Sequence, residues 1–297
     1  MPTYLLLPLL ASLLLVCGLL FVKRITSAGI KPWTVTLVAN WFATLLFSLM
    51  WFLGGSVQPL ADFWQPAAIA ILYILGQVFT FAAVQHGDVS VATPVFGIKV
   101  LLVAVLATLF LGAALSWRIW GAASLATCGI GLVQWTPRSH ATSVSHQSRM
   151  FLSIALAMAA AGCFATFDIL VQTYSPAWGT GRILPIAYGM VGLFSLVFLP
   201  AFQVRAIQDP QLRLLLFAGG FLIAAQAVCI VFTLATFGDA ARVNVVYALR
   251  GMWGVALAWL AARIWGGSEA NLPRSVMTAR LIGACLLTAA VVLAIRI

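Results

Sequence analysis

Long apolar runs dominate the pattern of hydrophobic and polar positions along this 297-residue chain. Each run is about 20 residues long, the length that an α-helix needs to cross the hydrocarbon core of a bilayer. Apolar and polar residues do not alternate within the runs, so the pattern argues against the strands of a membrane β-barrel. We predict ten membrane-spanning helices, near residues 3–22, 33–53, 66–86, 89–111, 116–135, 150–173, 183–203, 212–237, 240–264 and 277–296.

A polar stretch at residues 136–149 divides these helices into two sets of five. We therefore predict a first five-helix repeat over 1–135, a linker over 136–149 and a second five-helix repeat over 150–297. Because five is odd, a second repeat that folds like the first must lie upside down in the membrane. Such inverted repeats bring equivalent residues together near the middle of the bilayer, as in many secondary transporters.

The composition supports an all-α, multi-pass integral membrane protein. Only 7% of the residues are charged and 63% are hydrophobic, whereas a soluble domain has about 25% charged residues. We expect the cell membrane as its location, which is the inner membrane in a Gram-negative cell. The basic residues that give the net charge of +10 are scattered over the ends of the apolar runs and do not form one cluster. That distribution indicates membrane lipid, and not nucleic acid, as a partner.

Lysine and arginine are more frequent in the odd-numbered loops than in the even-numbered loops, and the first loop alone carries Lys23, Arg24 and Lys31. Positively charged loops stay preferentially in the cytoplasm. The charge bias therefore predicts cytoplasmic odd-numbered loops and both termini on the outside.

The fourth and ninth runs share a pattern of polar residues at a constant offset of 151 residues. Both runs follow a Gly-Asp pair, at 87–88 and at 238–239. A polar residue, an aromatic residue and a cation then recur three residues apart, with Thr93 matching Asn244, Phe96 matching Tyr247 and Lys99 matching Arg250.

A cation near the centre of a membrane helix costs roughly 2.5–3.5 kcal/mol on insertion scales. Two such residues at equivalent positions favour a paired site for an anionic ligand. Arg250 can hold a carboxylate or phosphate with two hydrogen bonds, and Lys99 adds a point charge. The other four residues of the pattern would shape the pocket. The alternative is that each cation only pairs with a buried carboxylate or with backbone carbonyls.

Asp168 is the only acidic residue deep inside a predicted span. It can neutralise one of the two cations, take part in gating or proton coupling, or contact the substrate. Even when Asp168 is ionised, the two cations leave a surplus of one positive charge. Gln77 and Gln226 lie at roughly equivalent positions in the third and eighth spans, where each can hydrogen-bond a ligand or a neighbouring helix.

The sequence contains no nucleophile elbow, no glycine-rich phosphate loop and no membrane zinc motif, so we expect no enzyme. We also expect no cofactor and no metal site.

On these features the chain resembles the drug/metabolite transporter superfamily, most closely its ten-helix EamA-like permeases. The resemblance rests on the two sets of five spans, the two Gly-Asp pairs and the glycine-rich fifth run Gly121–Leu132. It implies a transporter of small metabolites. Plastid phosphate translocators of this superfamily hold phosphate with basic residues on the fourth and ninth helices. Lys99 and Arg250 are similar in position, although Leu249 stands where that family has another basic residue.

The sequence therefore predicts a secondary transporter that moves a small anionic or zwitterionic organic metabolite by alternating access. The first alternative is an exporter of neutral or aromatic amino acids, in which the cations hold the carboxylate. An alternative from another class is a non-transporting membrane scaffold or lipid-handling protein. A homodimer is compatible with each of these functions.

Overall fold

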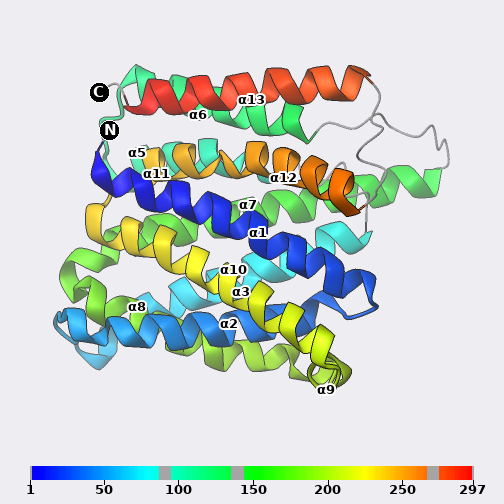
Figure 1. The fold of residues 1–297 in the computed structure, drawn as a ribbon. Coiled ribbons are helices and arrows are strands. Elements are labelled where there is room, and N and C mark those ends of the chain that lie inside the picture. The colour runs from blue at the N-terminus through cyan, green and yellow to red at the C-terminus, as the bar shows by residue number, and fades with distance from the viewer. Residues whose placement is uncertain (1, 87–94, 135–143, 266–273, 296–297) are drawn as a thin grey trace. The chain divides into compact units, whose positions relative to one another are not determined.

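The computed structural model describes residues 2–86, 95–134, 144–265 and 274–295. Every regular element among these residues is a helix, as Figure 1 shows. The predicted all-α class is therefore confirmed. The α-helices are α1 (Leu6–Ser27), α2 (Pro32–Ser48), α3 (Trp64–His86), α5 (Lys99–Leu111), α6 (Trp117–Val133), α7 (Val144–Trp178), α8 (Thr180–Phe194), α9 (Arg205–Gln208), α10 (Pro210–Phe237), α11 (Ala240–Tyr247), α12 (Arg250–Trp265) and α13 (Arg274–Ile295).

Seven helical stretches among the described residues are long and apolar enough to cross a membrane. They coincide with seven of the ten predicted spans: Thr3–Ser27, Pro32–Leu53, Leu60–Gln85, Met150–Trp178, Thr180–Ala201, Pro210–Phe237 and Ser275–Ile295. The protein is accordingly a multi-pass membrane protein. The full count of ten and the inverted arrangement of the two halves stay predictions.

Two spans that the sequence predicted as continuous helices are interrupted, so the expectation of single helices over 89–111 and 240–264 is wrong. Helical turns at Val95–Phe96 end in a turn at Gly97–Ile98 before α5 begins. Similarly, α11 ends at Tyr247, and a turn at residues 248–249 precedes α12. Each interruption lies immediately before a cation, because α5 begins at Lys99 and α12 begins at Arg250.

The ends of α10 show how local sequence fixes a helix here. The carboxylate of Asp209 accepts hydrogen bonds from the backbone N–H groups of Gln211 and Leu212, and Pro210 occupies the first helical position. These are favoured residues at a helix start, because the first N–H groups lack partners within the helix. The helix ends at Phe237, and the following Gly238 has a φ of +62°, the left-handed conformation that glycine adopts without steric cost.

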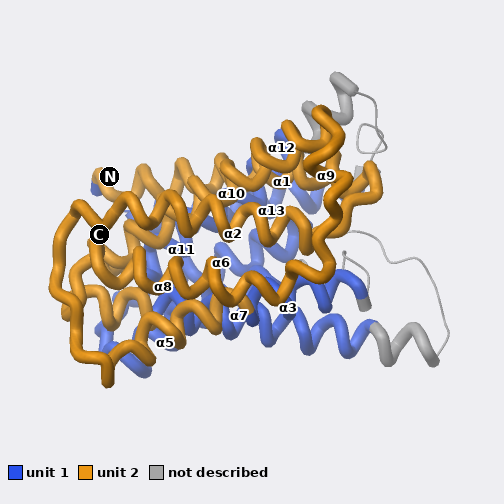
Figure 2. The backbone as a smooth tube through the Cα atoms, turned by 90° about the horizontal axis from the view of Figure 1, so that it is seen from below, with its two compact units in different colours: residues 1–2, 75–169, 240–297 blue, residues 3–74, 170–239 orange. Residues whose placement is uncertain are grey.

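The chain divides into two compact units (Figure 2). Unit 1 comprises residues 1–2, 75–169 and 240–297, and unit 2 comprises residues 3–74 and 170–239. Each unit draws on both predicted repeats, and α3 and α7 contribute to both units. This division by contacts differs from the division by sequence, so the repeat boundaries at 1–135 and 150–297 stay predictions.

In unit 2, α10 packs against α1 and α2, and α2 packs against α8. Small residues let the helices approach closely in this unit. A Cβ atom added at Gly18 of α1 would lie 3.0 Å from Ile223 of α10, and one at Gly219 of α10 would lie 3.0 Å from Phe21 of α1. Such glycine contacts are typical of helix pairs in membranes, where van der Waals packing replaces the hydrophobic effect as the driving force.

In unit 1, α6 packs along α13, and α11 and α12 pack against both of them. Backbone approaches backbone at the crossing of α6 and α13. A Cβ atom at Gly283 would lie 2.7 Å from the carbonyl oxygen of Gly129 and 2.7 Å from the backbone nitrogen of Val133.

Gly283→Ala should therefore lower the thermal stability of the purified protein by several degrees, because overpacking of this kind costs about 1–3 kcal/mol. Gly131→Ala on α6 is the matched control, since a Cβ there meets no atom within 4 Å. The control should leave the melting temperature unchanged or raise it, because alanine forms helices better than glycine. Thermal unfolding in detergent, followed by intrinsic fluorescence, measures both. Equal melting temperatures for the two variants would contradict the close approach of α6 and α13.

Candidate functional site

The two helix breaks share three backbone hydrogen bonds. At the first break, Ile98 N–H donates to Val95, Val100 N–H to Gly97 and Leu102 N–H to Ile98. At the second, Leu249 N–H donates to Val246, Gly251 N–H to Ala248 and Trp253 N–H to Leu249. Every donor and acceptor of one set lies 151 residues from its counterpart in the other. The sequence repeat is thus accompanied by a repeat of local backbone structure.

Each break is a tight turn in which two of the three shared bonds join residues three apart, and such turns within helices often mark functional positions. The residue after the turn starts a new helix, and the positive end of the helix dipole lies there. Of its first N–H groups, those of Val100 and Gly251 donate to carbonyls of the turn. In membrane transporters, discontinuous helices of this kind present their N-termini to anionic groups of the substrate. The breaks therefore add positive potential where the sequence already supplies Lys99 and Arg250.

Lys99 forms an ion pair with Asp168. Its ammonium nitrogen lies 2.7 Å from Oδ2 of Asp168, and the two side chains are only 11% and 3% exposed. The amide of Asn244 donates to the same carboxylate oxygen at 2.7 Å and to the backbone carbonyl of Ala240 at 2.9 Å. Asp168 thus links α5, α7 and α11, and both amide hydrogens of Asn244 are used within the protein.

Arg250 has a different environment. Its guanidinium lies over the ring of Tyr247, 4.5 Å from the ring centroid, a geometry for cation–π attraction. Tyr247 itself is 5% exposed. Within the described residues, no carboxylate lies within 4 Å of this guanidinium, since the ion pair of Asp168 is with Lys99. Of the two cations in the repeated pattern, Arg250 is therefore the one without an ion-pair partner among the described residues.

An aromatic ring missing from the sequence-based set also lies at this site. The Lys99 ammonium is 5.9 Å from the centroid of the Phe164 ring. The ring packs on Gly76 of α3, where a Cβ atom would lie 2.8 Å from it. A signal was available in the sequence, because Phe164 precedes Asp168 by four residues and so lies on the same face of α7.

The remaining predicted site residues lie in varied places. Phe96 packs against a small core formed by Ala83 of α3 and Ala157 of α7. Gln77 lies on the unit 1 part of α3, whereas Gln226 is a buried residue of α10 in unit 2. Thr93 lies outside the described residues. The structure thus brings together Lys99, Asp168, Asn244, Tyr247 and Arg250 in unit 1 and keeps Gln226 in the other unit.

The charges of this group leave one positive charge in excess, because the group contains Lys99 and Arg250 but a single carboxylate, that of Asp168. A group with this balance, in the apolar interior of a membrane unit, attracts an anion more strongly than a cation. The guanidinium of Arg250 also offers N–H donors that no acidic side chain of the described residues accepts. Chemically it is suited to binding and exchanging an anion.

Comparisons with known proteins indicate the family and the fold. Residues 2–135 match the EamA-like transporter family. A solved structure that is titled only as the crystal structure of a protein shares the fold, with a TM-score of 0.70, 14% sequence identity and 98% of both chains covered. At that identity the likeness shows the fold alone. No curated protein matches the chain.

Proposed function

Because its residues 2–135 place the chain in the EamA-like transporter family of the drug/metabolite transporter superfamily, it is a membrane transporter, and we propose that it carries a small organic anion or zwitterion. The resemblance noted in the sequence is confirmed by this match. The family is one of transporters and not of enzymes. The observation that carries the proposed cargo is the guanidinium of Arg250, without an ion-pair partner among the described residues, beside the Lys99–Asp168 pair.

In this proposal the anionic group of the cargo binds the fork of Arg250 with two hydrogen bonds. The ring of Tyr247 holds the guanidinium in place, and the N–H groups at the start of α12 add to the positive potential. Charged groups in membrane interiors generally mark substrate or ion pathways. The anionic group of the bound cargo then supplies the counter-charge for the guanidinium of Arg250.

In this proposal Asp168 acts as an internal counterion. It holds Lys99 in the empty transporter, and a cargo anion that reaches Lys99 competes with it. An ammonium group of a zwitterionic cargo would instead compete with Lys99 for Asp168. Either exchange changes the contacts among α5, α7 and α11, which is what a coupling residue must do. Protonation of the displaced carboxylate would link transport to a proton gradient.

The transport mechanism that we propose is alternating access between two inverted five-helix repeats, with the protein in the cell membrane. The matched breaks before Lys99 and Arg250 support it, because equivalent discontinuous helices in the two halves are a feature of inverted-repeat transporters. Phe96 and Gln77 of unit 1 complete the proposed pocket as residues that contact the cargo. The roles of Thr93 and Gln226 in cargo binding stay predictions from the sequence.

Uptake into proteoliposomes tests the proposed function. Purified protein should take up radiolabelled anions with saturable kinetics, and unlabelled anions inside the vesicles should accelerate uptake by exchange. Succinate, 3-phosphoglycerate, glutamate and phenylalanine sample the dianionic, phosphorylated, acidic zwitterionic and aromatic zwitterionic classes. Competition among them distinguishes a carrier of phosphorylated compounds from an amino-acid exporter. Uptake that is linear in concentration for every probe would contradict transport and favour a scaffold or lipid-handling role.

A further inference from the structure

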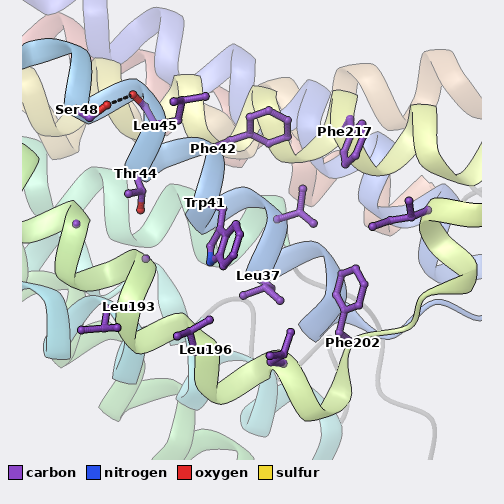
Figure 3. Close-up of a pocket in the computed structure, with 15 residues that line it drawn as sticks. Leu37, Trp41, Phe42, Thr44, Leu45, Ser48, Leu193, Leu196, Phe202 and Phe217 are labelled. Carbon is purple, nitrogen blue, oxygen red and sulfur yellow. Dashed lines mark hydrogen bonds between the residues drawn. The ribbon is translucent and has the colours of Figure 1, made fainter.

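Unit 2 carries an apolar groove of about 870 Å³, and every residue that lines it belongs to unit 2. It lies between α2 on one side and α8 with the following η4 (Ser195–Ala201) on the other, and α9 and α10 complete it. Figure 3 shows Leu37, Trp41 and Phe202 directed into the space between these segments. The only polar side chains of the lining are those of Trp41, Thr44 and Ser48.

The groove is open to the surroundings of unit 2. Three of its lining side chains, Trp41, Leu45 and Leu193, are 55%, 60% and 62% exposed. They belong to helical stretches that are long and apolar enough to cross a membrane. Hydrocarbon is therefore the medium that meets the groove, and an acyl chain is the ligand class that its lining fits.

The groove has the depth of one lipid leaflet. Along α2 its lining runs from Leu37 to Ser48, a rise of about 16 Å at 1.5 Å per residue. Half of the roughly 30 Å hydrocarbon core is about the same length. An acyl chain that enters from one membrane surface thus reaches the inner end of the groove near the middle of the bilayer.

Positive charge lies at the other end of the groove. Phe202 and Ile207 line that end, and the backbone N–H of Lys31 donates to the side chain of the neighbouring Gln203. The backbone N–H of Gln203 in turn donates to Thr34 Oγ1 at 3.1 Å. The exposed side chains of Lys31, Arg205 and Arg213 belong to the loop and helix starts at this end.

Among the described residues, Lys23, Arg24 and Asp209 also lie near this end, since their neighbours Ile25, Ala206 and Leu212 share one core cluster. Asp209 is engaged in capping α10, so the balance at the end of the groove is strongly positive. Trp33 stacks on Phe198 here, with ring centroids 5.1 Å apart. Tryptophan is enriched at the level of lipid headgroups.

We propose that this groove binds one anionic phospholipid, with an acyl chain between α2 and the α8–η4 segment and the phosphate at Lys31, Arg205 and Arg213. The apolar lining and the depth of the groove fit an acyl chain, and the basic end fits an anionic headgroup. A zwitterionic phospholipid has the same acyl chains without the net negative charge, and so it binds more weakly. The site is a lipid site of the transporter and does not depend on the identity of the cargo.

The chain offers a variant that fills the groove without disturbing the backbone. Gly189 lines it, and a Cβ atom there meets no atom within 4 Å. Gly189→Phe therefore places a ring where the acyl chain lies. Val197→Phe is the matched control, because Val197 is 66% exposed on the adjoining η4 and does not line the groove.

Native mass spectrometry of the delipidated protein tests the proposal, with dioleoyl phosphatidylglycerol and dioleoyl phosphatidylcholine as probes. The wild type should retain one lipid molecule with either probe. The concentration of phosphatidylglycerol needed for this should be about tenfold lower than the concentration of phosphatidylcholine. Gly189→Phe should lose this retention, and Val197→Phe should keep it. Equal retention of the two lipids by the wild type, or unchanged retention by Gly189→Phe, would overturn the proposal.

A second variant tests the headgroup end without touching the groove. The triple change Lys31→Gln, Arg205→Gln and Arg213→Gln alters exposed side chains only, and it should reduce phosphatidylglycerol binding to the level of phosphatidylcholine. The charge-conserving set Lys31→Arg, Arg205→Lys and Arg213→Lys should retain the preference. If Gly189→Phe instead shifts the protein from dimer to monomer while lipid retention is unchanged, the groove is an interface between two copies and the proposal fails.

Discussion

Arg250→Ala should abolish transport while the protein still folds. Hydrogen bonds to charged groups contribute about 1.5–3 kcal/mol each, so loss of a two-bond contact lowers cargo affinity by about 100-fold or more. Folding should survive, because no carboxylate of the described chain relies on this guanidinium. Proteoliposome uptake at low cargo concentration, with gel filtration of the same sample, measures both effects.

Two further variants of Arg250 separate charge from packing. Arg250→Met keeps an unbranched apolar stem and should be as inactive as the alanine variant, since the stem alone binds no anion. Arg250→Lys keeps the charge and loses the planar fork, so it should transport at an intermediate rate. Wild-type transport by Arg250→Met, or aggregation of all three variants, would assign Arg250 a structural role instead.

Asp168→Asn should strongly destabilise unit 1. Removal of one partner from a buried ion pair costs about 3–5 kcal/mol, because the other charge stays buried without compensation. Here Lys99 would be left with the ring of Phe164 and an amide in place of its carboxylate. The expected fall in melting temperature is on the order of 10 °C. Asp168→Glu, which retains the charge, should be affected much less.

A double variant provides the control for this pair. Lys99→Met combined with Asp168→Asn removes both charges, so the double variant should be more stable than either single variant. A coupling energy near zero in the resulting cycle would show that the pair does not act as a unit. If Asp168 also couples protons to transport, the double variant should bind cargo through Arg250 without responding to a proton gradient.

The all-helical membrane class follows from the sequence because run length and the lack of alternation are sufficient to identify helices. The breaks were harder to foresee. Gly97 is a recognisable weak point in the fourth span, but Ala248 and Leu249 are good helix formers, and nothing local predicts the turn there. The turn at 248–249 is set by the surroundings of α11 and α12 and not by residue propensity.

The candidate site shows the same limit. Spacing put Phe96 and Lys99 on one face, yet Phe96 packs into the contact of α3 with α7. Asn244 donates both amide hydrogens to the protein, which the sequence could not show. The sequence also left open which of the two cations pairs with Asp168, and in the structure this cation is Lys99. A contact between residues 69 positions apart depends on packing, which periodicity does not encode.

The most direct test of the paired-cation site is the thermal stability of the purified protein against a library of small metabolites, run in parallel on Lys99→Ala and Arg250→Ala. A ligand that binds only the folded state raises its stability by mass action. We expect anions or zwitterions to stabilise the wild type and neither variant, and the best ligand then identifies the cargo class. Equal shifts in the wild type and both variants would show that the cations do not bind cargo and would contradict the account.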